Sequence, residues 1–247
     1  ALRAVFTEMP ILIRDGELLV GQGAARLGAR AVYPEYHLHG LTPETTPAEV
    51  WGYWHGRTLS EEVHRAHPER LRLAESESAA GGCTGTASGF GHVIVDYEKA
   101  LRHGFRAILR EARQRLDDAP DDDREGRAFL EAVAIAAEGI TLWAERYADL
   151  AEALALREAN PARAAEPRRI AATCRRVPAE PARDFHEALQ SFWFVHLAMH
   201  IEQYGWSISA GRFDQYMYPL FHQDIASGAL SPEQAWELLL NLWVKFM

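Results

Sequence analysis

The sequence is short of cysteine, with only two, Cys83 and Cys174, among 247 residues. Two cysteines exclude both a disulfide scaffold and a four-cysteine zinc site. No run of about 18 apolar residues occurs, so neither a transmembrane helix nor a membrane partner is expected. A signal peptide is also lacking, and together with the low cysteine content this indicates a protein of the reducing cytoplasm.

Positive charge is scarce relative to negative charge. Lysine and arginine number 26 against 35 aspartates and glutamates, which gives a formal net charge of −9. A protein that binds a phosphate backbone needs a basic face, whereas the basic residues here are interspersed with acidic ones. The composition therefore excludes nucleic acid as a partner.

Hydrophobic residues are plentiful, at 48% of the chain, and supply enough apolar surface for a sizeable core. The chain opens on Ala1 rather than methionine, and its last residues, 245–247, lie inside an apolar helical pattern without a stop signal. Because helices normally end at a cap, we expect the polypeptide to continue. No internal repeat and no long linker is visible, so one mainly α body is expected.

The local patterns predict a short β-hairpin near the start and helices over most of the remainder. In residues 11–20, two apolar runs flank Asp15-Gly16, the usual pair of a type I′ turn. Residues 206–209 alternate and predict a short strand. Caps and apolar periodicity predict helices over residues 47–66, 96–116, 124–159 (as one helix or two joined near Gly139), a proline-bracketed segment around Cys174, 184–203, 211–227 and 231–247.

A glycine-rich segment, residues 79–92, ends at His92. Its glycines would let backbone N–H groups approach an anion, but the Gly-Lys-Ser/Thr of a Walker A loop does not follow. Two interpretations stay open: a flexible loop, and a loop whose small residues leave room for a substrate beside His92.

Three further groups of residues admit both a chemical and a structural interpretation. His196 and His200 share one helix face, as helical zinc ligands do, but no third ligand is evident and hydrogen-bonded core histidines are favoured. Cys174 lies beside two arginines, which would lower a thiol pKa, yet no histidine is placed beside it in sequence. Arg212 and Asp214 are expected to form a buried ion pair at a strand-to-helix corner.

The most distinctive run is Gly-Arg-Phe-Asp-Gln-Tyr at residues 211–216, which ends a longer polar and aromatic stretch that begins at Phe185. Supporting stretches occur, in order along the chain, at residues 17–22, 33–35, 91–99 and 231–239. Together they resemble the glycyl radical enzymes, the pyruvate formate-lyase-like superfamily, and especially their diol dehydratase-like branch. The resemblance spans nearly the whole chain.

The resemblance implies a ten-stranded α/β barrel of two antiparallel halves, each of parallel strands, wrapped in helices around an enclosed active site. This chain would be the N-terminal, mainly α portion of that domain. The resemblance also implies a backbone glycyl radical near the C-terminus, installed by a partner activase that uses an iron–sulfur cluster and S-adenosylmethionine. The radical passes to a cysteine that abstracts hydrogen from a small-molecule substrate, and in the dehydratase-like members a glutamate two residues later is the base. A homodimer is expected.

The reactive cysteine, the glutamate two residues after it and the radical glycine do not occur in this sequence. Two positions after the cysteines stand Gly85 and Arg176 rather than glutamate, and no glycine lies in the pattern of the radical loop. We therefore expect no catalytic residue and no bound cofactor within residues 1–247, and no turnover by this chain alone.

Substrate-binding residues carry over from the resemblance at three positions. In glycerol dehydratase-like members, substrate hydroxyls are contacted by a histidine before the Asp-Tyr-Glu-Lys helix and by a His-Ser pair before Gly-Arg-Phe-Asp. His92 matches the first histidine and Ser207 the serine, but Trp206 replaces the second histidine. An indole nitrogen cannot accept a hydrogen bond. If Trp206 faces the pocket rather than the core, a larger or more apolar substrate than a diol is expected.

The expected function is that of a segment of a glycyl radical lyase or dehydratase, which breaks a C–O, C–N, C–S or C–C bond of a small organic substrate. A pyruvate formate-lyase type formate C-acetyltransferase is the alternative within the family. A non-catalytic helical scaffold domain is the alternative outside it.

Overall fold

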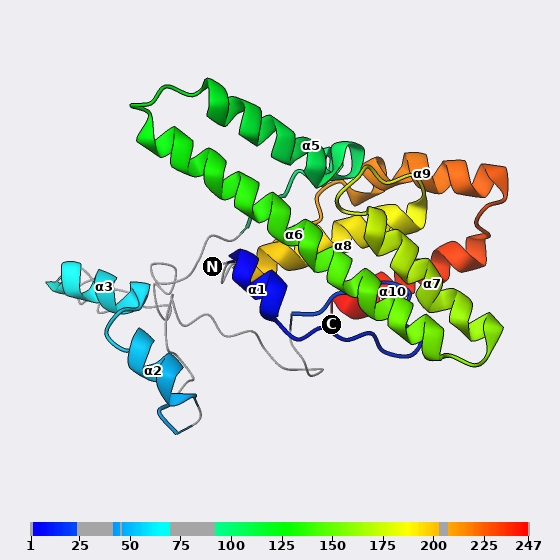
Figure 1. Ribbon diagram of the computed structural model, residues 1–247, viewed down its shortest axis with the longest axis horizontal. Helices are drawn as coiled ribbons and strands as arrows, with labels where there is room; N and C mark the ends of the chain where they lie inside the picture. The colour runs from blue at the N-terminus through cyan, green and yellow to red at the C-terminus, as the bar shows by residue number, and fades with distance from the viewer. Residues whose placement is uncertain (1, 24–41, 45, 70–91, 203–206, 247) are drawn as a thin grey trace. The chain divides into compact units, whose positions relative to one another are not determined.

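The computed structural model describes residues 2–23, 42–44, 46–69, 92–202 and 207–246, which are coloured in Figure 1. The chain divides into two compact units: a larger one of residues 1–29, 94–199 and 210–247, and a smaller one of residues 30–93 and 200–209. The expectation of one mainly α body stays a prediction. The chain passes repeatedly between the units, so no single linker in the sequence marks their boundary.

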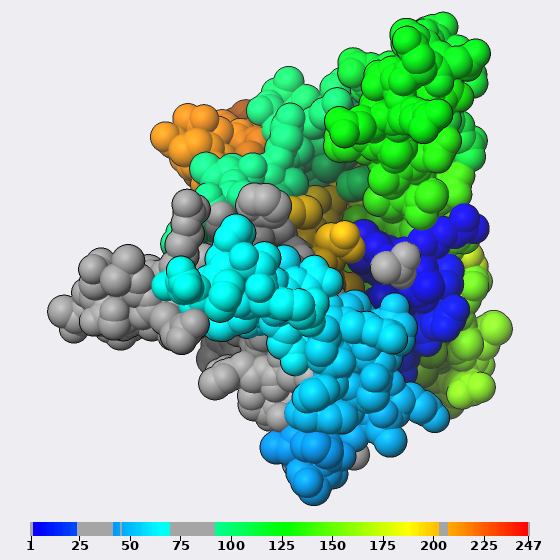
Figure 2. Space-filling model, turned by 90° about the vertical axis from the view of Figure 1, so that its left-hand side faces the viewer, coloured from blue at the N-terminus to red at the C-terminus, as the bar shows by residue number. Residues whose placement is uncertain are grey.

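The larger unit is built from helices. They are α1 (Leu2–Glu8), α5 (Tyr97–Asp118), α6 (Arg124–Arg157), α7 (Pro161–Arg176), most of α8 (Phe185–Glu202), α9 (Phe213–Ser227) and α10 (Pro232–Lys245). Helices α1, α5 and α7 each pack against α6, and α5 and α6 lie side by side in both views (Figures 1 and 2). The mainly α prediction is confirmed for the described residues, in which strand structure is limited to single bridged positions.

Side chains begin several of these helices where the sequence predicted. The Asp96 carboxylate accepts a hydrogen bond from the backbone N–H of Lys99 at 3.0 Å and starts α5. Ser231 and Gln234 exchange backbone and side-chain hydrogen bonds at the start of α10. Such caps each stabilise a helix by about 1 kcal/mol. Helix α6 runs unbroken through Gly139, which answers the open question of one helix or two.

Helix α8 is the core of the larger unit. Every side chain from Phe185 to Leu197 is buried, as expected for a helix that is apolar on most sides. Phe194 packs against Trp143 and Tyr147 of α6, with ring centroids 5.3 and 5.8 Å apart. The helix predicted over residues 184–203 is therefore confirmed.

The hairpin predicted for residues 11–20 was wrong, although a turn forms at the expected place. The N–H of Glu17 donates to the carbonyl of Arg14 at 3.2 Å. Only Gly16, with φ 79°, has positive φ there, whereas a type I′ turn needs positive φ at both central residues. Positive φ at the second central residue alone is the pattern of a type II turn, whose twist splays the flanking strands. The flanks remain unpaired with each other.

Side chains of α8 satisfy the backbone of this segment in place of a partner strand. The Gln190 amide both accepts from the N–H of Val20 and donates to its carbonyl, each at 2.8 Å. The indole of Trp193 donates to the carbonyl of Gly21 at 3.0 Å. These bonds supply the partners that buried backbone groups require, so the N-terminal segment is fixed on α8.

Within residues 47–66 of the smaller unit, two helices form where one was expected. They are α2 (Ala48–Trp54) and α3 (Leu59–Ala66). Gly56, with φ 81°, ends the first, and Thr58 and Glu61 form a capping box that starts the second. Pro47 precedes α2 without a side-chain cap. The local capping signal at Thr58 outweighed the continuous apolar pattern.

Candidate functional site

The two described candidates for substrate contact lie on segments that are hydrogen-bonded to each other. The N–H of Ser209 donates to the carbonyl of Val93 at 2.9 Å. Val93 follows His92 directly, and Ser209 is two residues beyond Ser207. Both His92 and Ser207 are exposed, and both belong to the smaller unit. The structure therefore places the two segments side by side with both side chains open to contact.

His92 and Ser207 also share an unusual backbone conformation. Their φ angles are 56° and 60°, and they are the only non-glycine residues with positive φ among those described. For an L-residue this region costs about 1–2 kcal/mol, and residues held there are concentrated at functional sites. Sequence reasoning gave no signal of this conformation.

Trp206, the third candidate, lies outside the described residues, as do Cys83 and the glycine-rich segment up to residue 91. Its replacement of the expected histidine is a fact of the sequence. Its orientation toward a pocket stays a prediction.

Arg212 and Asp214 form the expected ion pair, but it is not buried. Arg212 Nη2 lies 3.1 Å from Asp214 Oδ2, and the side chains are 70% and 72% exposed. The hydrogen bond from Arg212 lowers the pKa of Asp214. Exposed pairs contribute little to stability. The corner is instead shaped by Gly211, with φ 63°, and by the Tyr216 hydroxyl, which donates to the carbonyl of Ala210 at 2.7 Å.

His196 is a hydrogen-bonded core residue, as the favoured interpretation held. Its Nδ1 lies 2.7 Å from the hydroxyl of Tyr97, and its ring packs against Phe192 and Trp193. Burial lowers the pKa of His200. Within the part of the chain that the structure describes, His, Cys, Asp and Glu form no group of three able to hold a metal.

Cys174 is buried, and burial raises the pKa of its thiol. The alternative in which its neighbouring arginines activate it was wrong, because both are engaged by carboxylates. Arg175 pairs with Asp149 and Glu152, and Arg176 pairs with Glu187 at 3.4 Å. A buried neutral thiol is inert.

The Cys174 thiol predicts a loss of stability in alkali. The folded state holds this proton more tightly than the unfolded chain, whose thiol titrates near about pH 8.5. The stabilisation is therefore complete below that pH and is lost above it, with a slope of up to about 1.4 kcal/mol per pH unit. In a Cys83→Ser background, urea unfolding between pH 8 and 10 should show this slope. The additional change Cys174→Ala should flatten it, and an unchanged slope would contradict the assignment.

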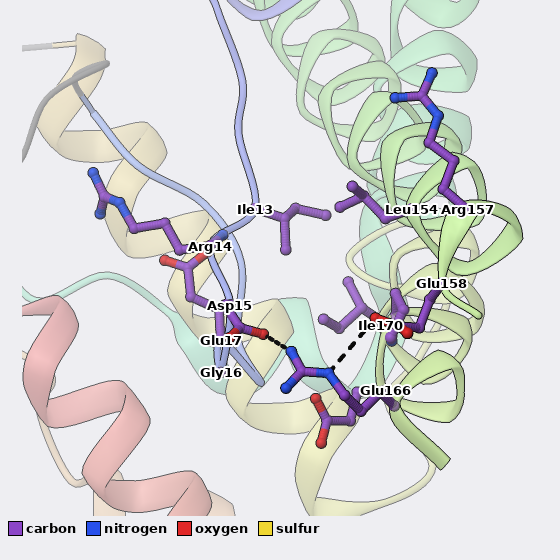
Figure 3. A pocket seen from close by; sticks show the side chains of 12 residues that line it. Ile13, Arg14, Asp15, Gly16, Glu17, Leu154, Arg157, Glu158, Glu166 and Ile170 are labelled. Carbon is purple, nitrogen blue, oxygen red and sulfur yellow. Dashed lines mark hydrogen bonds and ion pairs between the residues drawn. The ribbon is translucent and has the colours of Figure 1, made fainter. Parts of the chain in front are cut away.

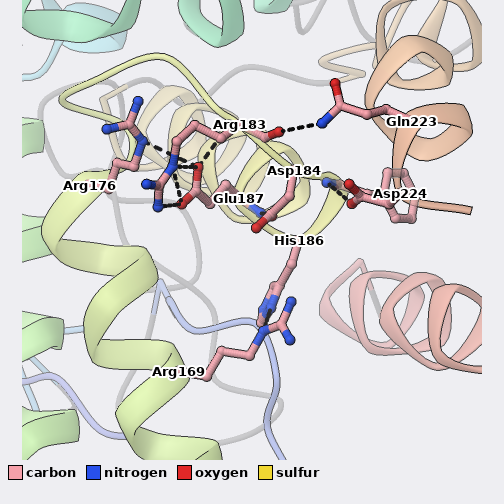
Figure 4. Close-up of polar contacts among 9 residues, drawn as sticks. Arg169, Arg176, Arg183, Asp184, His186, Glu187, Gln223 and Asp224 are labelled. Carbon is pink, nitrogen blue, oxygen red and sulfur yellow. Dashed lines mark hydrogen bonds and ion pairs between the residues drawn. The ribbon is translucent and has the colours of Figure 1, made fainter. Parts of the chain in front are cut away.

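A buried carboxylate near the start of α8 was missed by sequence reasoning. Glu187 accepts a hydrogen bond from the Arg183 guanidinium at 2.6 Å, and Arg176 lies on its other side (Figure 4). Close by, His186 accepts from Arg169 at 2.8 Å. The four-residue spacing of Arg183 and Glu187 was the available signal. These contacts fix α8 against its neighbours, and we assign them no chemistry.

At least two cavities are lined by described residues of the larger unit. The first, of about 290 Å³ (Figure 3), contains Arg163, which pairs with both Asp15 and Glu158. The second, here called the α10 groove, has a volume of about 700 Å³. Its lining is apolar and comprises Phe192, Ala210, Phe213, Trp236, Leu239, Leu240, Leu242, Trp243 and Phe246. Neither cavity is lined by His92 or Ser207.

The chain is similar to known proteins over its full length. The model of the family described as pyruvate formate lyase-like matches residues 1–247. The isethionate sulfite-lyase of Desulfovibrio desulfuricans is 37% identical over 99% of this chain and 33% of the relative. The trans-4-hydroxy-L-proline dehydratase of Clostridioides difficile is 29% identical over 95% of this chain and 32% of the relative.

Solved structures agree with the sequence comparisons. The glycerol-bound form of the B12-independent glycerol dehydratase from Clostridium butyricum matches with a TM-score of 0.89 at 33% identity. That match covers 99% of this chain and 34% of the dehydratase. The chain therefore spans about a third of the length of the relatives it matches. Among the described residues, no helix is long and apolar enough to cross a lipid bilayer.

Proposed function

The chain belongs to the pyruvate formate lyase-like family, and on that premise we propose that it is the N-terminal part of a glycyl radical lyase or dehydratase. In this proposal, residues 1–247 supply substrate-binding side chains. The reactive cysteine and the radical glycine belong to polypeptide outside this sequence. The complete enzyme works in the cytoplasm as a homodimer, after a separate activase has installed its radical.

One observation carries the assignment of the binding residues. His92 and Ser207, the two described positions that match the dehydratase-like pattern, lie on hydrogen-bonded segments and share a strained left-handed backbone. An imidazole and a hydroxyl can each donate or accept a hydrogen bond. Together they suit a small substrate that carries a hydroxyl group.

The substrate class we propose is a small hydroxylated organic acid or alcohol. Isethionate, which bears a hydroxyl and a sulfonate, is the first compound to test, because its lyase is among the relatives and is 37% identical. Cleavage would then occur at a C–S bond. Trp206, in place of a histidine acceptor, supports a substrate other than a simple diol.

The test uses the full-length protein, activated without oxygen by an S-adenosylmethionine-dependent activase. We expect the electron paramagnetic resonance signal of a glycyl radical, and sulfite release from isethionate or dehydration of trans-4-hydroxy-L-proline. A radical-bearing protein that acts on pyruvate and coenzyme A instead would favour the formate C-acetyltransferase alternative. Absence of any radical would favour the scaffold alternative.

The outer face of α10 supports the proposal that residues 1–247 pack against further polypeptide. Trp236, Leu240 and Trp243 form an exposed stripe with helical spacing, whereas Leu238 and Leu242 on the inner face are buried. A helix that is apolar on two faces is normally packed on both, and an exposed patch of this kind marks an interaction surface.

This stripe predicts strong binding of the dye anilinonaphthalene sulfonate by the 247-residue chain and weak binding by the full-length protein. Trp243→Glu should reduce the fluorescence of the dye with the 247-residue chain, because the change places a charge in the α10 groove. The matched control is Leu156→Glu on α6, where the leucine is 86% exposed, and it should leave the fluorescence unchanged. Equal fluorescence from the two lengths of protein would contradict the proposal.

A further inference from the structure

Tyr97 and His196 form a hydrogen-bonded pair in the core of the larger unit. Tyr97 is the first residue of α5 and is 1% exposed. Its hydroxyl lies 2.7 Å from Nδ1 of His196. The Tyr97 ring packs against Phe192, with centroids 4.5 Å apart, and its helix is capped at Asp96. Both partners are therefore held in fixed positions, and the proposed binding residues do not include either one.

This geometry is the one that one-electron oxidation of a phenol requires. Loss of an electron makes the phenolic O–H strongly acidic, so the proton must leave as the electron does. In a buried site there is no bulk water to receive it. A neutral imidazole with its proton on Nε2 presents Nδ1 as an acceptor, and 2.7 Å is within the range for direct proton transfer. Burial raises the pKa of Tyr97, which keeps the phenol protonated before oxidation.

We propose that Tyr97 is a redox-active tyrosine, which gives an electron to an oxidising radical while its hydroxyl proton moves to Nδ1 of His196. With a thiyl radical as the oxidant, the sulfur gains the electron and becomes a thiolate. Tyr97 becomes a neutral tyrosyl radical, and His196 becomes an imidazolium. The reactants are neutral and the product charges cancel, so the step balances.

This activity goes beyond substrate binding, because it gives the helices that hold Tyr97 and His196 a role in radical chemistry. A thiyl radical that forms without substrate beside it would take an electron from buried Tyr97 rather than abstract hydrogen from the surrounding backbone. In the reverse step the thiolate returns the electron to the tyrosyl radical, the proton moves back from His196 to the Tyr97 oxygen, and the thiyl radical is formed again.

Tyr147 provides an internal comparison. It is also buried, but the rings beside it are those of Trp143 and Phe194 rather than a histidine. If burial alone favoured oxidation, the two tyrosines would behave alike. If the hydrogen bond to His196 determines which tyrosine is oxidised, Tyr97 is oxidised in preference to Tyr147.

The test uses the 247-residue chain with photogenerated ruthenium(III) tris-bipyridine as the oxidant, and electron paramagnetic resonance as the readout, so it needs no substrate turnover. Tyr97→Phe should remove most of the long-lived tyrosyl signal, whereas Tyr147→Phe should keep it. His196→Gln retains a hydrogen-bond acceptor but no base, and should slow radical formation by about a hundredfold. Oxidation of the unaltered chain should also be slower in deuterium oxide.

Two outcomes would overturn the proposal. One is a tyrosyl signal of equal size in the Tyr97→Phe variant. The other is an unchanged rate of radical formation in folded His196→Gln, which would make the pair a structural contact only. If His196→Gln does not fold, by circular dichroism, the comparison of the Tyr97→Phe and Tyr147→Phe variants decides alone.

Discussion

Activated full-length enzyme that carries His92→Ala is expected to turn over substrate about a hundredfold more slowly than the unaltered enzyme, as measured by kcat/KM. A lost hydrogen bond to a reacting substrate typically has an effect of this order. The His92 side chain is exposed in the described structure, so its removal should change the free energy of unfolding by no more than about 1 kcal/mol.

Two controls separate the loss of the imidazole from damage to the fold. Asparagine tolerates positive φ better than alanine does, so His92→Asn should fold like the unaltered protein and still lose turnover. His103 on α5 is also exposed, and His103→Ala should leave kcat/KM unchanged. Normal turnover by folded His92→Asn would remove His92 from the site.

Gly104→Ala is expected to lower the free energy of unfolding by at least about 3 kcal/mol, the largest effect on stability that we predict. Gly104 interrupts α5 with φ 71° and ψ 164°, a region that is open essentially to glycine alone. A Cβ at this position would also collide with the carbonyl oxygen of Ala179 and lie 2.6 Å from the carbonyl carbon of Glu180. Both neighbours are backbone atoms, so neither can move cheaply.

Two other helical glycines make a graded comparison by urea unfolding. At Gly52 a Cβ would meet nothing within 4 Å, so Gly52→Ala should be neutral or stabilise by up to about 1 kcal/mol. At Gly139 a Cβ would lie 3.2 Å from Cα of Arg3, so Gly139→Ala should fall between the other two. A Gly104→Ala variant within about 1 kcal/mol of the unaltered chain would contradict this account of the kink.

Local signals in the sequence were sufficient for much of the fold. The caps at Asp96 and Ser231 and the apolar helix that begins at Phe185 are formed by residues close in sequence, and each was predicted correctly. The kink at Gly104 was not predicted, because its cause is the backbone of Ala179, 75 positions away in the chain.

The failure of the hairpin prediction has a physical reason, which is that tertiary partners decided the outcome. The flanks of Asp15-Gly16 read as a hairpin, but Gln190 and Trp193 supply the hydrogen bonds that a second strand would have made. A sequence pattern shows which backbone segments need partners. It does not show that side chains of a helix some 170 residues away will provide them.

The candidate site came from family resemblance, not from spacing or periodicity. No local pattern singles out His92 or Ser207, and their shared left-handed backbone became apparent only in the structure. The redox pair of Tyr97 and His196 is likewise a tertiary contact, between residues 99 positions apart. His196 carried a partial signal, because a histidine on a buried helix needs a hydrogen-bonding partner.

A crystal structure of the full-length protein with isethionate bound tests whether His92 and Ser207 bind the substrate. The side chains of both residues should lie within about 3 Å of polar atoms of the ligand. A ligand bound with either side chain out of contact, or two side chains that face separate hollows, would contradict this prediction.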